Sequence, residues 1–119
     1  MSPNIELTMS FPLRAMHRLK TNAEDEPLHG HNYKIEIALG GELDTEAEWL
    51  YSRDLVDKIV RELVLDRFDK TYLNDILDKT SGEYLAKTFF EILKKSDMGP
   101  RLRRLALQET RKNRFVCYG

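Results

Sequence analysis

The sequence lacks several features that would place it in a class at once. Its 119 residues contain one cysteine, Cys117, so an internal disulfide framework is excluded. No apolar run reaches the roughly 18–20 residues of a membrane span, and the N-terminus lacks the charged-then-apolar layout of a signal peptide. The 19 Lys and Arg residues nearly balance 20 Asp and Glu, and this removes the bulk electrostatic case for binding nucleic acid or an anionic membrane. We therefore expect one cytoplasmic domain over residues 1–119, with neither nucleic acid nor membrane as a partner.

Two segments near the N-terminus alternate between apolar and polar residues, which predicts strands. In residues 5–17 the odd positions share one face, and Pro12 on the other face indicates a sheet edge or a break. The polar residues 20–27 predict a loop. In residues 29–39 the odd positions again share a face, and Gly40-Gly41 ends the run.

Apolar residues at helical spacing predict two helices in the middle of the chain. The first covers residues 55–64, with Ser52 available as its N-cap. The second covers residues 84–93, with a capping box in Thr80-Ser81-Gly82-Glu83 before it and Gly99-Pro100 after it.

Two short strands close the chain, at about 102–109 and 114–118. The order β-β-α-α-β-β predicts an α+β fold, with an antiparallel four-stranded sheet and two helices on one of its faces. Such a sheet has open edges, which proteins commonly cover by forming oligomers.

All three histidines of the chain lie between positions 17 and 31. His29 and His31 are two apart on a predicted strand, so their rings project from the same face, and His17 closes the matching face of the preceding strand. If these strands pair as a hairpin, the three imidazoles converge. Three imidazoles with an open fourth position are typical of a catalytic zinc site. We therefore predict a Zn2+ site at His17, His29 and His31, the alternative being three unrelated histidines.

The segments around these histidines are Ala15-Met16-His17-Arg18-Leu19 and Leu28-His29-Gly30-His31-Asn32-Tyr33. They resemble the 6-pyruvoyltetrahydropterin synthase / 6-carboxytetrahydropterin synthase family, and the similarity continues in residues 68–74, 81–87 and 108–110. The resemblance implies the tunnelling fold (T-fold), in which three subunits close a barrel of strands and two trimers stack into a homo-hexamer. It also implies zinc bound by the three histidines, and active sites between subunits.

The resemblance further implies a pterin-binding site. Glu109 matches the glutamate that anchors the pterin ring, and residues matching Ser81 and Glu83 contact the ring too. A carboxylate suits this role because it can accept two parallel hydrogen bonds from the N–H and amino group of the pterin edge. The alternative is an exposed glutamate at a strand end, beside Arg111.

Two catalytic positions depart from the usual family pattern. Asp25 stands where most members carry a cysteine, and Asp69-Lys70 stands where they carry an Asp-His pair. Glu26 instead fits a variant branch with a Glu-x-x-His-Gly-His arrangement, which cleaves the side chain of a dihydroneopterin compound to 6-hydroxymethyl-7,8-dihydropterin. We expect Glu26 to act as the base, Lys70 to stabilise an anion or carry protons, and Asp69 to orient Lys70. A solvated acidic loop and a surface ion pair are the alternatives.

The sequence leaves three functions open. The first is a zinc-dependent lyase acting on dihydroneopterin or its triphosphate. The second is formation of 6-carboxytetrahydropterin or a pyruvoyl product, with Asp25 or Glu26 in the role of the cysteine. The third is a paralogue that binds zinc and a pterin without turnover. A basic cluster is more simply a solvated edge or a site for substrate phosphates than a nucleic-acid surface; it comprises Arg101, Arg103, Arg104, Arg111, Lys112 and Arg114.

Overall fold

A computed structural model of the chain describes residues 4–19, 28–43 and 50–119. The predicted loop at 20–27, with Asp25 and Glu26, lies outside the described residues. Within the described ranges, no helix has the length and apolar character needed to cross a membrane.

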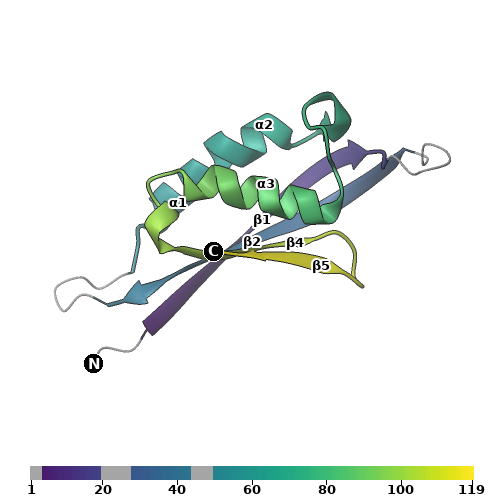
Figure 1. The fold of residues 1–119 in the computed structure, drawn as a ribbon. Coiled ribbons are helices and arrows are strands. Elements are labelled where there is room, and N and C mark those ends of the chain that lie inside the picture. Colours follow the sequence, from purple (N-terminus) through teal and green to yellow (C-terminus); the bar gives the residue numbers. More distant parts are fainter. Residues whose placement is uncertain (1–3, 20–27, 44–49) are drawn as a thin grey trace.

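A five-stranded sheet forms the frame of the molecule (Figure 1). The long strands β1 (Asn4–His17) and β2 (His29–Glu42) pair antiparallel over their whole length, and β4 (Leu102–Gln108) and β5 (Arg114–Tyr118) extend the sheet beyond β2. These are the four antiparallel strands that the sequence predicts. Pro12 lies on β1 away from the short stretch where another strand pairs with its outer edge, as a residue without an N–H requires.

The fifth strand corrects the prediction of a purely antiparallel, four-stranded sheet. β3 (Thr71–Tyr72) pairs in parallel with Ala15 and Met16 of β1, so the sheet is mixed. Two residues are too few to show an alternating pattern. The segment just before β3 is attached to β1 by a hydrogen bond, in which the Arg14 N–H donates to Asp69 Oδ1 (2.7 Å).

The helices pack on one face of the sheet (Figure 1). α1 (Arg53–Val60) runs through a π-helical turn (Arg61–Leu65) into α2 (Asp66–Phe68), and α3 (Gly82–Lys94) follows, with 3-10 turns at Leu73–Asp75 and Gly99–Arg101. α1, the π-helical turn and α2 together correspond to the first predicted helix, and α3 corresponds to the second. The α+β class is therefore confirmed.

One of the two predicted helix starts is confirmed and the other is wrong in detail. Ser52 caps α1 by accepting a hydrogen bond from the Leu55 N–H (3.3 Å). The capping box would need Thr80 as the N-cap of α3, but Ser81 takes that position and accepts from the Tyr84 N–H (3.4 Å). Thr80 lies just before the helix, buried, with its carbonyl bonded to His17.

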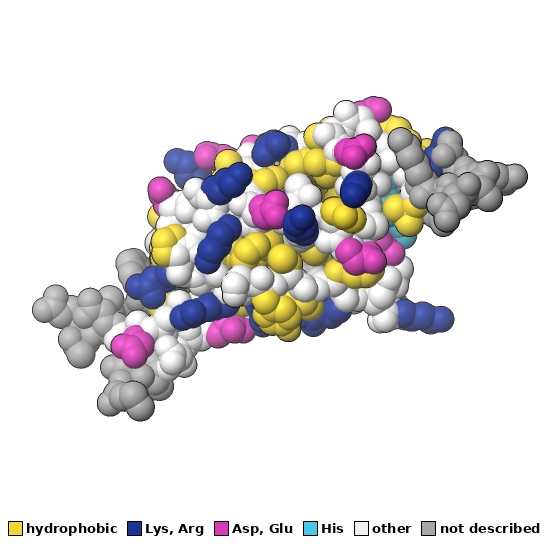
Figure 2. All heavy atoms as spheres, viewed as in Figure 1, with side chains coloured by type: hydrophobic (Ala, Val, Ile, Leu, Met, Phe, Trp, Pro, Cys, Tyr) yellow, Lys and Arg dark blue, Asp and Glu magenta, His cyan; other side chains and the backbone are white. Residues whose placement is uncertain are grey.

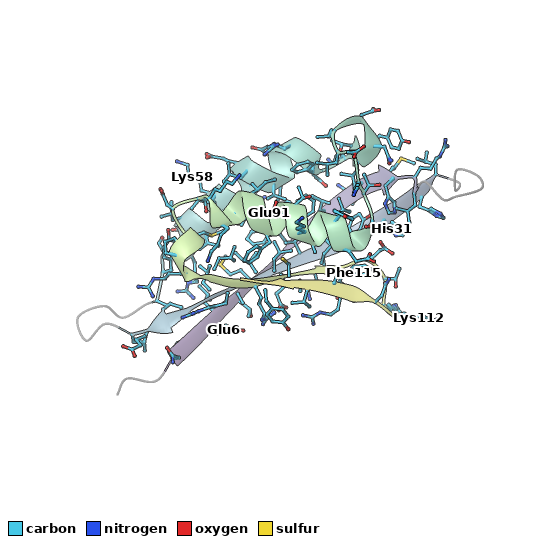
Figure 3. All side chains as sticks on the ribbon, viewed as in Figure 1. Glu6, His31, Lys58, Glu91, Lys112 and Phe115 are labelled. Carbon is cyan, nitrogen blue, oxygen red and sulfur yellow. The ribbon has the colours of Figure 1, made fainter. Side chains whose placement is uncertain are left out.

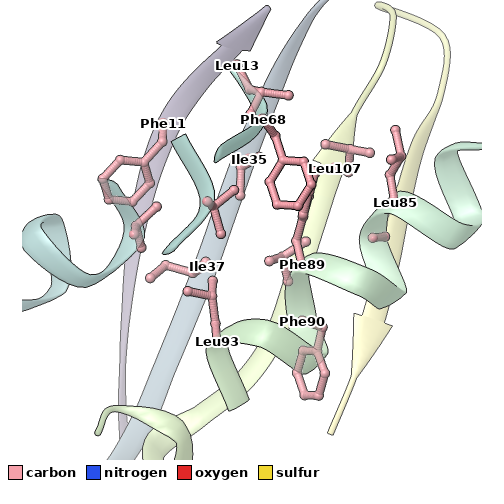
Figure 4. Close-up of a cluster of buried hydrophobic side chains, with 14 of the residues drawn as sticks. Phe11, Leu13, Ile35, Ile37, Phe68, Leu85, Phe89, Phe90, Leu93 and Leu107 are labelled. Atoms are coloured by element: carbon pink, nitrogen blue, oxygen red, sulfur yellow. The ribbon is translucent and has the colours of Figure 1, made fainter. Parts of the chain in front are cut away.

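The core lies between the sheet and the helices (Figure 4). Phe11, Leu13 and Ile35 come from the alternating positions of β1 and β2, and they meet aromatic side chains of the helical layer. Among these, the rings of Phe68 and Phe89 lie 5.2 Å apart between centroids. The same alternation that buries these residues places the histidines on the core face at one end of the sheet.

Arg104 of the predicted basic cluster bridges three strands through its side chain. Its guanidinium donates to Glu36 Oε1 (3.0 Å) on β2 and to Glu6 Oε1 (2.7 Å) on β1. Arg104 is thus engaged within the sheet.

Candidate active site

The three histidines lie together where the end of β1 meets the start of β2. The hairpin register pairs His17 with His29 and Ala15 with His31. Ring centroids are 5.0 Å apart for His17 and His31, 6.1 Å for His29 and His31, and 6.3 Å for His17 and His29. Histidine atoms reach the surface at this end of the molecule (Figure 2), and Figure 3 places His31 near the start of α3.

The hydrogen bond of His17 determines which of its nitrogens is available. The His17 side chain is buried, and its Nδ1 lies 2.7 Å from the carbonyl oxygen of Thr80. A carbonyl only accepts hydrogen bonds, so Nδ1 carries a proton, and Nε2 is the nitrogen with the lone pair in the neutral ring. Histidines that bind metals are commonly oriented in this way, by a backbone carbonyl on the other nitrogen.

The environment of His31 favours the neutral imidazole. Burial lowers the pKa of the His31 imidazole. The Glu109 carboxylate raises this pKa, and the neighbouring rings of His17 and His29 lower it. The neutral ring is the form that binds a metal ion.

Glu109 joins two of the histidines in a compact group of possible ligands. One ligand atom from each of His17, His31 and Glu109 lies within 4.8 Å of the others, whereas His29 is not part of this group. Two imidazoles and a carboxylate are donors that Zn2+ accepts. The turn after β4 holds Glu109, because its N–H donates to the Asn113 carbonyl (3.3 Å).

The structure gives the remaining predicted residues different surroundings. Ser81 caps α3, and Glu83 is exposed in the first turn of that helix. Lys70 has a left-handed backbone (φ 60°) and lines a pocket of about 340 Å³ together with His31. The Asp69 carboxylate accepts the Arg14 N–H, so the structure gives it a backbone partner on β1. Glu26 lies outside the described residues.

Tyr33 is a residue of the site that the sequence analysis did not single out. Its ring lies 5.3 Å from that of His31 and 6.3 Å from that of His17, and it is 1 % exposed. Its buried hydroxyl has no hydrogen-bond partner within the part of the chain that the structure describes. Burial raises the pKa of this phenol, and Glu109 raises it further. The signal was available, since Tyr33 follows His31 on the same strand face.

The fold and this site define a class of protein: a T-fold domain that gathers histidines and a carboxylate at one end of its sheet. The sequence matches the family described as 6-pyruvoyl tetrahydropterin synthase over residues 6–119. The chain belongs to this family.

Relatives and solved structures agree with this assignment. The chain is 34% identical over 98 residues to the dihydroneopterin monophosphate aldolase of Pyrococcus furiosus, covering 80% of this chain and 81% of that protein. It is 27% identical over 109 residues to an Archaeoglobus fulgidus protein provisionally named 6-carboxy-5,6,7,8-tetrahydropterin synthase, covering 92% of this chain and 93% of that one. The structure of Caenorhabditis elegans 6-pyruvoyl tetrahydropterin synthase superposes with a TM-score of 0.88 at 26% identity, covering 99% of this chain and 97% of that chain.

Proposed function

We propose that this protein is a zinc-dependent lyase that cleaves the side chain of a dihydroneopterin substrate to 6-hydroxymethyl-7,8-dihydropterin. The observation that carries the proposal is the group of His17, His31 and Glu109, in which Thr80 leaves His17 Nε2 available as a ligand. The 34% identity to an archaeal dihydroneopterin monophosphate aldolase supports the same class of reaction.

His17, His29 and His31 are the proposed zinc ligands. The His29 side chain is exposed at the start of β2, and its ring stands nearly parallel to that of His31, with centroids 6.1 Å apart. In this proposal the His29 side chain rotates to complete a set of three imidazoles, and Glu109 then stays available for the pterin. Zinc bound there would hold the hydroxyls of the substrate side chain and make them more acidic.

The choice between His29 and Glu109 as third ligand can be measured. We expect His29→Ala to weaken zinc binding at least tenfold, and Glu109→Gln to weaken binding of neopterin, the oxidised pterin, while zinc binding stays close to that of the unaltered protein. Competition with a chromophoric chelator measures the first affinity, and pterin fluorescence the second. The opposite pattern would make the carboxylate the metal ligand.

The residues of the chain then divide the reaction among them. Glu109 accepts two hydrogen bonds from the pterin edge, and Ser81 and Glu83 contact the ring. Glu26 removes the proton from the hydroxyl on the second side-chain carbon. The bond between the first and second carbons breaks, its electron pair moves into the pterin ring, and a two-carbon aldehyde leaves. A proton returned to the first carbon completes the hydroxymethyl product, with Lys70 stabilising the anion in between.

A homo-hexamer in the cytoplasm is the proposed form of the protein, with active sites between subunits. β1 pairs on its outer side only at Ala15 and Met16, and β5 has no further strand beside it among the described residues. These edges are able to pair with neighbouring copies. The molar mass from light scattering, measured as the protein elutes from a size-exclusion column, distinguishes a hexamer from a trimer.

A second candidate function is 6-carboxytetrahydropterin synthase activity, which the name of the Archaeoglobus fulgidus relative favours. The two candidates give different products from related substrates, so product masses separate them. A pterin-binding paralogue without turnover would give neither product.

The test is a turnover assay on zinc-loaded protein with 7,8-dihydroneopterin, its monophosphate and its triphosphate. We expect release of 6-hydroxymethyl-7,8-dihydropterin, reduced at least a hundredfold in Glu26→Gln, because loss of a general base typically costs about 10²–10⁴ in rate. Glu24→Gln removes a charge of the same sign two positions earlier in the sequence and is the matched control. A 6-carboxytetrahydropterin product, or no product from any of the three compounds, would refute the lyase.

A further inference from the structure

The Glu109 carboxylate lies where it could serve either a metal ion or a pterin ring. One of its oxygens is within 4.8 Å of ligand atoms of His17 and His31. The proposed function nevertheless needs this carboxylate for the pterin edge. Among the residues that the structure describes, its side chain accepts one hydrogen bond, a long one from Asn113 Nδ2 (3.5 Å). A bond of this length fixes the carboxylate poorly, so another donor is needed to hold it in the orientation that binds the pterin.

Tyr33 brings a donor to the same end of the sheet. It lies two positions after His31 on β2 and therefore shares the face of that histidine. The pairing of β2 with β4 ends with Lys34 opposite Gln108, and Glu109 follows in the chain. Burial raises the pKa of the Tyr33 phenol, and the nearby Glu109 carboxylate raises it further. The phenol thus keeps its proton at neutral pH and is able to donate it in a hydrogen bond.

The Tyr33 hydroxyl makes no hydrogen bond in the ligand-free protein, as far as the described residues show. The side chain is 1 % exposed, and its ring packs beside the rings of His31 and His17. Phenylalanine would fill the same space without the cost of an unsatisfied buried hydroxyl. A donor that is buried at this cost in the free protein is available for a bond that forms when the site is occupied.

We infer that the Tyr33 hydroxyl donates a hydrogen bond to the Glu109 carboxylate when a pterin binds, and so keeps this carboxylate on the pterin edge and away from the metal ion. A carboxylate has about four acceptor positions, of which the pterin edge uses two, so one remains for a phenol. Hydrogen bonds from a hydroxyl to a carboxylate are short and strong. The inference rests on the proposed function in one respect, the binding of the pterin by Glu109.

Tyr33 is a positioning residue in this arrangement. Its hydroxyl oxygen is closed off from solvent, so it acts on the pterin through Glu109. Its removal should therefore weaken only those ligands that donate two hydrogen bonds to the carboxylate. A change in packing alone would weaken ligands of the same shape equally.

Equilibrium binding of neopterin and of its 2-oxo analogue, measured by pteridine fluorescence on zinc-loaded protein, tests this without requiring turnover. The analogue carries a carbonyl in place of the amino group, so it cannot donate the second hydrogen bond to Glu109. We expect Tyr33→Phe to weaken neopterin binding at least fivefold and to change binding of the analogue less than twofold. Tyr118→Phe removes a hydroxyl from a side chain that is 73 % exposed, and should leave both dissociation constants unchanged.

The same substitution in the Glu109→Gln background tests the route of the effect. There, Tyr33→Phe should change the neopterin dissociation constant less than twofold, because the carboxylate that the hydroxyl would hold is gone. If this background binds neopterin too weakly to measure, the comparison of the two ligands decides. An equal loss for both ligands, an equal loss in both backgrounds, or weaker zinc binding in Tyr33→Phe would overturn the inference.

The outcomes separate this inference from the lyase proposal. Unchanged neopterin binding in Tyr33→Phe would overturn the role of Tyr33 and leave the lyase standing, since the product assay decides the lyase. A selective loss of neopterin binding, together with no 6-hydroxymethyl-7,8-dihydropterin from the unaltered protein, would support the role of Tyr33 and refute the lyase. Neopterin binding that Glu109→Gln leaves intact would overturn both the inference and the pterin role of Glu109.

Discussion

Replacing Tyr33 by phenylalanine should stabilise the protein. The substitution removes one oxygen from a side chain that is 1 % exposed and keeps the ring that packs against His31 and His17. The hydroxyl has no partner within the described residues, so the folded state bears its desolvation without a compensating hydrogen bond. Packing against the two histidine rings depends on the aromatic ring and does not require the hydroxyl.

The size of the effect follows from that missing partner. An unsatisfied buried polar group costs about 1–3 kcal/mol. The cost for Tyr33 lies in the lower part of this range, because a hydroxyl can rotate to its least unfavourable direction. We expect Tyr33→Phe to raise the free energy of unfolding by about 1–2 kcal/mol. In a chain of this length each kcal/mol moves Tm by roughly 4 °C, so Tm should rise by roughly 4–8 °C.

The measurement is urea unfolding and a thermal scan of the metal-free protein at one fixed concentration, since assembly and bound metal both shift apparent stability. Tyr118→Phe is the matched control: its side chain is 73 % exposed, so its stability should stay within about 0.5 kcal/mol of the unaltered protein. A loss of 1 kcal/mol or more in Tyr33→Phe would refute the reasoning, because it would mean that the hydroxyl is bonded in the native protein. Higher stability with lower turnover would assign the hydroxyl to the active site.

Three further predictions concern other parts of the fold. Gly82→Ala should destabilise by about 1–3 kcal/mol in urea unfolding, because the added Cβ meets the ring of Phe115; an unchanged midpoint would contradict this packing. Lys70→Gly should be about 1 kcal/mol more stable than Lys70→Ala, because φ is 60° at this position, while both lose turnover; equal stability of the two would argue against the left-handed backbone. Burial raises the pKa of the Cys117 thiol. The pH midpoint of its alkylation by iodoacetamide should therefore lie higher in the folded protein than in the urea-unfolded chain. Equal midpoints in the two states would show that the thiol is not shielded.

Most of the sheet could be predicted because its side-chain period is two. The alternation in residues 5–17 and 29–39 sorts core from solvent positions, and a slip of one residue would turn every apolar side chain outward, so the pattern excludes registers that are shifted by an odd number of residues. β3 could not be predicted, since two residues have no period and their pairing depends on contacts of Asp69 and Lys70 with Arg14. The capping box failed for a similar reason: the Thr80 carbonyl has a partner 63 positions away in His17.

The sequence by itself determined the α+β class, the hairpin and the gathering of three histidines at its end, because all of these depend on residues that are near one another in the chain. Only the tertiary structure brought Glu109 to the histidines. The pairing of β2 and β4 ends with Lys34 opposite Gln108, and Glu109 follows in the chain, close enough to Tyr33 and His31 to affect the pKa of both side chains. The Tyr33 hydroxyl, which has no partner among the described residues, was likewise decided there, because burial arises only when distant elements pack together.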